Sequence, residues 1–285
     1  MEKFLKKQLP LEGVFSLFLL FSFTLGLGIF VAFKLNEFFR IQEKKIEPVS
    51  FWQFLGNFFL ALFLVLVILF LGKRLKKRKK NLLKILFLFT TGLGSLISLE
   101  LLFGEPVALV LVLILIFLWL KSPCILFQNI LVILGIAGTS GLLGTKMNSE
   151  TVVLLLILFS IYDYISVYKT KHMIKMAKEM IKEGVILGLI LPKKISDFKA
   201  PSNEVVPGGK KFFVLGGGDI AFPLILCSAL VGEGLFNSLI VALFSLFGLF
   251  FSLWLFFSQR IQKPIPALPP IALFSIIGYL ITKVL

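Results

Sequence analysis

The fold is decided by residues 212–231, FFVLGGGDIAFPLILCSALV, an almost wholly apolar run that nevertheless contains an acid, Asp219. A second apolar run, VVLLLILFSIYDYISVY at 152–168, contains Asp163 in the same way. Both runs have roughly the length of a membrane span, and an ionisable side chain in the hydrocarbon layer is costly and is usually kept for function. The two aspartates therefore predict a functional site inside a membrane protein.

The composition of the chain agrees with this interpretation. The 285 residues are 58% hydrophobic, and the mean hydropathy of +1.00 is higher than a soluble domain would have. The net charge of +15 is explained by basic residues that flank spans and meet anionic lipid headgroups, so no nucleic-acid partner is expected. With only Cys124, Cys227 and His172, a Cys/His zinc site is excluded, and we expect no metal and no other cofactor.

The apolar runs predict an all-α membrane domain over residues 1–285 with nine transmembrane helices. The expected spans are 14–33, 51–72, 82–103, 106–120, 123–144, 152–168, 212–231, 235–257 and 266–285. If the connecting segments alternate between the two sides, 24 of the 30 Lys and Arg residues fall on the side of the N-terminus. The positive-inside rule then places the N-terminus in the cytoplasm and the C-terminus outside.

The segment 169–211 is predicted to be a cytoplasmic loop with structure of its own. Apolar residues recur at helical spacing between its lysines, which indicates an amphipathic interfacial helix: Met173, Met176, Ala177, Met180 and Ile181. The following run, Gly184–Leu191, is apolar but too short to span. It is either a re-entrant or interfacial segment, or a gate or substrate-pairing element that leads to the site.

Glycines occur in two patterns with different interpretations. In the fifth predicted span they recur every three residues, which is typical of close helix packing, at Gly135, Gly138, Gly141 and Gly144. Three consecutive glycines, Gly216–Gly218, directly precede Asp219. They weaken a helix and allow another backbone to approach the acid closely.

The two acids are expected to lie at matching depth. Asp163 lies six residues before Lys169 and Asp219 eight residues after Lys211, which is about 9 Å and about 12 Å along a helix. Because the two spans are consecutive and antiparallel, the carboxyls can face each other. Such a pair shares one proton: the ionised member activates a water and the protonated member polarises a carbonyl, as in an aspartyl protease. A proton or cation relay in a transporter explains two intramembrane acids equally well.

The last segment contains four prolines that cannot all lie in a regular helix: Pro264, Pro266, Pro269 and Pro270. We expect the final helix to begin near Pro270 and residues 264–270 to enter the membrane as irregular backbone. Unpaired backbone groups there could bind an extended peptide by strand addition. A simple cap on the last helix is the alternative.

Three motifs together resemble the signatures of the presenilin and signal peptide peptidase family. They are Tyr162-Asp163, the GxGD motif Gly216-Gly217-Gly218-Asp219, and Pro266-Ala267-Leu268, in the sixth, seventh and ninth predicted spans. The resemblance implies an intramembrane aspartyl endopeptidase with Asp163 and Asp219 as the dyad. It also implies that the remaining motif residues shape the active site: Tyr162, Gly216, Gly217, Gly218, Pro266, Ala267 and Leu268. The family often has Leu where this chain has Gly217, a difference that bears on the substrate preference of this chain and not on the chemistry.

The resemblance further implies the partners and the location. The substrates would be single-pass transmembrane helices or signal-peptide remnants, in contact with membrane lipids, and a homo-oligomer is compatible with the sequence. The orientation resembles presenilin rather than signal peptide peptidase, and the compact 169–211 loop is similar to that of archaeal homologues, which suggests a prokaryotic cell membrane. Three alternatives are a prepilin-peptidase-like GxGD protease, an ion- or proton-coupled transporter, and a catalytically silent scaffold of the same fold.

Overall fold

The computed structural model describes residues 11–42, 48–74, 79–170, 180–181, 184–205, 211–259 and 264–285. His172 and most of the predicted amphipathic helix, including Met173, Met176 and Ala177, lie outside the described residues.

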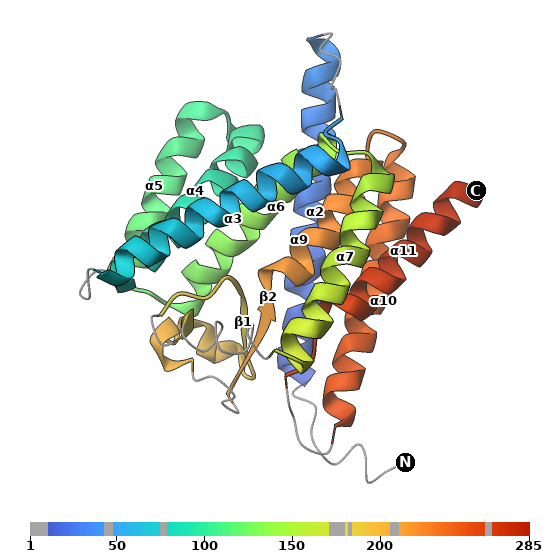
Figure 1. The fold of residues 1–285 in the computed structure, drawn as a ribbon. Helices are drawn as coiled ribbons and strands as arrows, with labels where there is room; N and C mark the ends of the chain where they lie inside the picture. Colours follow the sequence, from blue (N-terminus) through green and yellow to red (C-terminus); the bar gives the residue numbers. More distant parts are fainter. Residues whose placement is uncertain are drawn as a thin grey trace.

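Apolar helices make up most of the molecule, and each predicted span contains one. The helices are α2 (Leu11–Ile41), α3 (Phe51–Arg74), α4 (Lys79–Phe103), α5 (Glu105–Lys121), α6 (Ile125–Thr145), α7 (Ser149–Tyr168), α9 (Gly217–Leu230), α10 (Leu235–Ser258) and α11 (Leu268–Val284). In Figure 1, α4, α5 and α6 form one side of the molecule and α7, α10 and α11 the other, with α2 and α9 between them.

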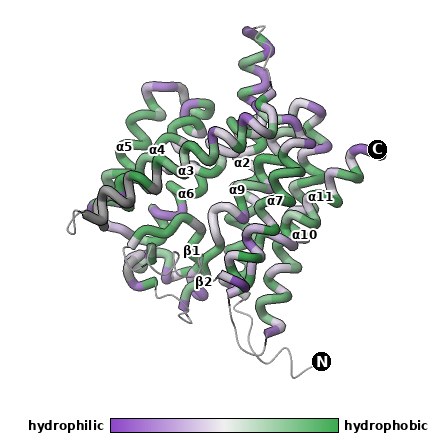
Figure 2. Tube along the Cα trace, viewed as in Figure 1, coloured by the Kyte–Doolittle hydropathy of each residue, from purple (hydrophilic) through white to green (hydrophobic). Residues whose placement is uncertain are grey.

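The pattern of hydropathy fits a membrane protein. Figure 2 shows apolar residues along the helices and polar residues concentrated at the helix ends and in the connecting segments. Within the described residues, five helices are long and apolar enough to cross a membrane: Glu12–Ile41, Leu83–Phe103, Ile125–Thr145, Ser149–Tyr168 and Leu235–Ser258. The total of nine spans and the direction of the termini stay predictions.

Helix α6 packs closely against α2, α4 and α9 because its glycines admit three neighbours. A Cβ atom on Gly141 would lie 2.6 Å from Cγ1 of Val31 in α2, and one on Gly144 would lie 2.7 Å from the Ile225 carbonyl oxygen in α9. At Gly138, a Cβ would overlap the backbone of α4. The predicted role of these glycines in helix packing is confirmed, and α6 thereby fixes where α9 stands.

The span predicted at 212–231 is not helical in its first five residues. Phe212–Gly216 form a strand, β2, and the helix begins only at Gly217. β2 pairs antiparallel with β1 (Gly188–Pro192), so the second half of the apolar run Gly184–Leu191 is a strand as well. Short apolar runs do not reveal by periodicity whether they are strand or helix. Each run supplies the backbone partners that the other needs, and the glycines end the strand.

Two buried amides of α6 hold the sheet against the helices. Asn129 donates from Nδ2 to the Ile190 carbonyl at 2.7 Å and accepts from the Ile190 N–H at 2.9 Å. Gln128 donates to the Ile186 carbonyl at 2.6 Å and accepts from the Trp119 indole N–H at 3.2 Å. Between β1 and β2 the chain forms two short 3-10 helices, η1 (Ile195–Lys199) and η2 (Ser202–Glu204).

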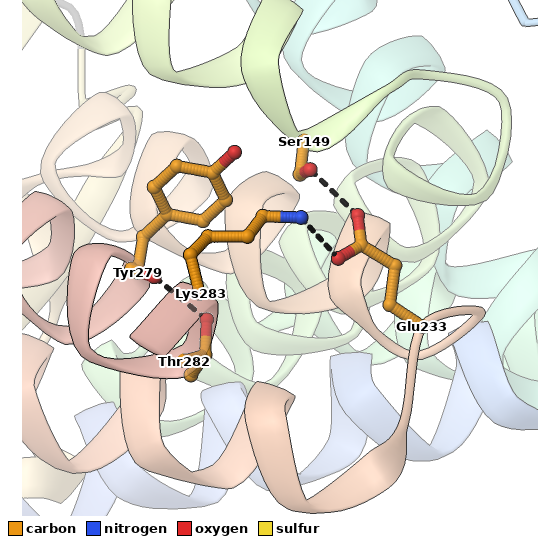
Figure 3. A network of polar contacts seen from close by, with 5 residues as sticks. All are labelled: Ser149, Glu233, Tyr279, Thr282 and Lys283. Atoms are coloured by element: carbon orange, nitrogen blue, oxygen red, sulfur yellow. Dashed lines mark hydrogen bonds and ion pairs between the residues drawn. The ribbon is translucent and has the colours of Figure 1, made fainter. Parts of the chain in front are cut away.

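A polar network joins three helices at their ends away from the sheet (Figure 3). Glu233, just after α9, accepts a hydrogen bond of 2.6 Å from Ser149 at the start of α7 and an ion pair of 2.8 Å from Lys283 at the end of α11. Partial burial alone would raise the pKa of Glu233, but the hydrogen bonds from Lys283 and Ser149 hold that pKa below its ordinary value of 4.5.

The lowered pKa of Glu233 predicts a pH-dependent contribution to stability. A carboxyl whose pKa is depressed by folding stabilises the protein fully above the ordinary value and loses this effect as the pH falls through the lowered one. We expect Glu233→Gln to lower the melting temperature slightly at neutral pH, since the ion pair is partly exposed. The difference from the parent protein should shrink when the melting curves are repeated at strongly acidic pH. A difference that grows there would contradict the assignment.

Candidate active site

The two aspartates are buried and face each other across α7 and α9. Asp163 is 5% exposed and lies near the C-terminal end of α7, whereas Asp219 is 8% exposed and lies in the first turn of α9. The two helices pack together, and the carboxyls are close enough to interact electrostatically. The structure therefore brings together the two acids that the sequence singled out.

The reason for their meeting differs in part from the one predicted. The rise of about 1.5 Å per residue that placed Asp219 applies only to a helix, and residues 212–216 are extended. The sheet thus carries the chain to the start of α9, where Asp219 is the third residue. There its carboxyl lies near the positive end of the helix dipole, which favours an acid.

Backbone groups from two motifs contact the acids. Asp219 accepts a hydrogen bond from the backbone of Gly216, and Asp163 accepts one from the backbone of Leu268. The Oδ2 atom of Asp163 is buried and has no hydrogen-bond partner among the described residues. A buried carboxylate oxygen without a protein partner is suited to bind a polar group of substrate or solvent.

Two of the three glycines before Asp219 are needed for close approach. A Cβ on Gly216 would lie 2.9 Å from Oδ2 of Asp219, and one on Gly217 would lie 3.2 Å from the Leu187 carbonyl oxygen. That carbonyl accepts the Gly217 N–H at 3.0 Å, which joins the start of α9 to the chain just before β1. Gly218 is exposed and lies against the ring of Phe222.

Helix α10 positions the segment around Pro266–Leu268. Ser252 donates a hydrogen bond to the Ala267 carbonyl at 3.1 Å, and a Cβ on Gly248 would lie 2.6 Å from the Cα of Ile271. Residues 264–266 are irregular, as predicted, but α11 begins at Leu268, two residues earlier than Pro270. Pro266 and Leu268 are buried.

A side chain at position 248 should therefore disturb the site from a distance. Because Gly248→Leu would push on the backbone of α11, we expect it to shift the Leu268 N–H away from Asp163, to cost about 1–3 kcal/mol of stability, and to reduce cleavage severalfold. The control is Gly26→Leu, since Gly26 has open space around it. Cleavage rate and melting temperature measure both effects, and equal rates for the two variants would contradict the prediction.

One predicted site residue lies apart from the others. Tyr162 precedes Asp163 in α7, but its side chain is 58% exposed. Sequence reasoning missed Ser252 and Gly248, although a signal exists: small residues lie three and four positions apart in α10, at Ser245, Gly248 and Ser252. In the described part of the chain, no three His, Cys, Asp or Glu side chains gather as metal ligands would. The expectation of no cofactor stays a prediction.

Two buried aspartates between apolar helices, with glycines before one and a proline-rich segment against the other, are the arrangement of a membrane-embedded aspartyl protease. Residues 15–285 match the family described as "Signal-peptide peptidase, presenilin aspartyl protease", and the chain belongs to this family. The resemblance seen in the three motifs is thereby confirmed, and the protein is an intramembrane hydrolase of peptide bonds.

Solved structures share the fold. A presenilin family intramembrane aspartate protease in space group C222 is 22% identical over 95% of this chain and 98% of its own, with a TM-score of 0.64. A structure of such a protease in space group P2 is 24% identical over 92% and 96% of the two chains, with a TM-score of 0.55. At this identity the likeness concerns the fold alone. Among curated protein sequences no significant match was found.

Proposed function

We propose that Asp163 and Asp219 are the catalytic dyad of this protease. The observation that supports the proposal is the burial of both carboxyls at one point between α7 and α9, where they interact. In this proposal one carboxylate takes a proton from a water, and the water attacks the carbonyl carbon of the scissile peptide. The other carboxyl donates its proton toward that carbonyl oxygen, and the tetrahedral intermediate then collapses with protonation of the leaving amine.

The surrounding residues serve the dyad by holding it in place. The backbone groups of Gly216 and Leu268 each contact one acid. Oδ2 of Asp163, which is buried without a protein partner among the described atoms, is the oxygen we assign to the attacking water. Pro266 and Ala267 keep the Leu268 backbone at this position through the bond from Ser252. Tyr162, being exposed, would contact lipid or an entering substrate.

The substrates in this proposal are membrane helices that must unwind before cleavage. A peptide bond in a helix is shielded by its own hydrogen bonds, and an unwound segment in lipid needs new partners for its backbone. An exposed strand edge supplies such partners by strand addition. β2 leads directly into the GxGD motif, so a segment paired with it would lie beside Asp219.

The edge available for this pairing belongs to β2 and not to β1. Both backbone groups of Ile190 are bonded to Asn129, so they point away from β2. Ile190 stands opposite Val214 in the antiparallel sheet. Because Ile190 does not bond to β2, this is a non-hydrogen-bonded pair, and in such a pair both residues direct their N–H and C=O groups away from the partner strand. The N–H and C=O of Val214 therefore face away from β1. The alternative that Gly184–Leu191 pairs with substrate is wrong at Ile190, because Asn129 uses the backbone groups of that residue.

We also propose the orientation predicted from the basic residues, with the dyad in the cytoplasmic half of the membrane. First cleavage should then fall in the cytoplasmic half of the substrate's span. The lipid contacts, the homo-oligomer and the prokaryotic membrane stay predictions.

The experiment that tests the function uses the purified full chain and a model single-pass helix in liposomes. We expect cleavage that an aspartyl-protease transition-state mimic abolishes, with products whose masses place the first cut in the cytoplasmic half. Absence of cleavage, or cleavage that is insensitive to the mimic, would overturn the proposal. First cuts near the outer face would overturn the orientation only.

The helicity of the substrate should control its rate of cleavage. Gly or Pro placed at the predicted cut weakens the helix by about 1–3 kcal/mol per residue, so such substrates should be cleaved severalfold faster than the parent. A Leu-rich replacement of the same length should be cleaved more slowly. Initial rates under one lipid composition measure the effect. Equal rates for the Gly and Leu substrates would show that unwinding does not limit the reaction.

A further inference from the structure

Two phenylalanines form a stacked pair beside the aspartates. Phe159 in α7 and Phe222 in α9 have ring centroids 4.3 Å apart and an interplanar angle of 26°. This is the shortest centroid separation among the ring pairs of the described residues. Stacked aromatic pairs contribute beyond the area that they bury, so this contact ties α7 to α9 at a defined distance.

The register of the two helices places this pair next to the dyad. Phe159 lies four residues before Asp163, and Phe222 lies three residues after Asp219. Residues three or four apart lie on the same face of a helix, so each ring occupies the face of its own aspartate. Because α7 and α9 run in opposite directions (Figure 1), both rings lie on the same side of the dyad, away from the sheet.

The dyad thus has two kinds of neighbour. The backbone groups of Gly216 and Leu268 contact the acids directly. The ring pair lies one helical turn from them and packs against the main hydrophobic core. Phe58 of α3 meets Phe159 edge-on at 5.2 Å, and the ring of Phe222 lies beside Gly218 at the start of α9.

We propose that Phe159 and Phe222 are a positioning pair that sets the separation of the two carboxyls. The inference rests on the proposed dyad. Neither ring touches the reacting atoms in this proposal; the pair acts by fixing the spacing of α7 and α9 one turn from the aspartates. Misplacement of a catalytic group by about 1 Å can cost on the order of 100-fold in rate.

The test compares Phe159→Leu, Phe222→Leu and the double variant with the parent in liposomes. Each single variant should lose about tenfold in kcat, with KM changed less than about twofold, because the substrate-binding edge is untouched. The affinity for a transition-state mimic that bridges both carboxyls should fall by a similar factor. The double variant should be no worse than either single variant, since both remove one shared contact.

Two sets of controls separate positioning from general packing. Phe18 and Phe250 are a ring pair of α2 and α10, at 6.4 Å, on helices that carry neither aspartate. Phe18→Leu should keep the kcat of the parent even if its melting temperature falls as much as that of Phe159→Leu or Phe222→Leu. Phe159→Tyr and Phe222→Tyr retain a ring and should keep kcat within about twofold. If the Leu variants do not fold, Met variants, whose flexible side chain fills the same space, carry the same expectations.

The outcomes distinguish this inference from the proposed function. The inference is overturned if the losses multiply in the double variant, if they appear in KM alone, or if Phe18→Leu loses kcat equally. A parent protein that does not cleave, or Asp→Asn variants that do, would instead overturn the dyad itself. If the parent cleaves, the Asn variants are inert and kcat is unchanged in both Leu variants, only the positioning role of the ring pair is overturned.

Discussion

Replacement of either buried aspartate by asparagine is expected to abolish cleavage. Asp163→Asn and Asp219→Asn each leave one carboxyl, and a single acid cannot be both the base that activates water and the acid that protonates the carbonyl oxygen. An amide can neither accept nor release the catalytic proton. The rate of each variant should therefore fall to the background of the inhibited parent protein.

The same substitutions should leave the fold intact. Both carboxyls are buried, and a neutral amide of the same shape is less costly than an acid in this environment. The melting temperature should hold or rise. A matched control is Asp197→Asn in η1, a partly exposed aspartate near the sheet, which should keep full activity. Turnover above background in either dyad variant would refute the assignment.

The second large effect is expected at a residue that carries no catalytic group. Val214→Pro removes the N–H that faces away from β1, and an added substrate strand would then leave one of its carbonyls without a partner. Such a loss in a water-poor site costs about 1–3 kcal/mol, which corresponds to a decrease of about 5- to 150-fold in kcat/KM. Proline is tolerated at an outward-facing position of an edge strand, so the fold should survive.

Val214→Ala is the control for this experiment. It removes the side chain, which is 42% exposed, but keeps the N–H. Its kcat/KM should stay close to that of the parent, and affinity for a small transition-state mimic should be preserved in both variants. If Val214→Pro and Val214→Ala cleave at the same rate, the substrate does not pair with β2 at this position.

The sequence by itself determined the class of protein and the identity of the acids. Charge inside an apolar run is costly wherever the run lies in the membrane, so Asp163 and Asp219 could be identified without coordinates. The spacing of the glycines in α6 likewise reports a local requirement, since a helix can approach another closely only where side chains are small. The three motifs, taken in order, were sufficient to indicate the family.

The tertiary structure alone decided how the acids are held and what lies around them. Residues 212–216 and 188–192 became strands because each found the other as a partner, and no local pattern encodes such a long-range pairing. The bonds of Asn129 to Ile190, and the stacking of Phe159 on Phe222, likewise join residues that are 61 and 63 positions apart in the chain. An apolar side chain in a membrane helix has the same composition signal whether it faces lipid or a neighbour. Only the packing of the folded chain decides between lipid and a neighbouring helix, and this packing sets the geometry of the site.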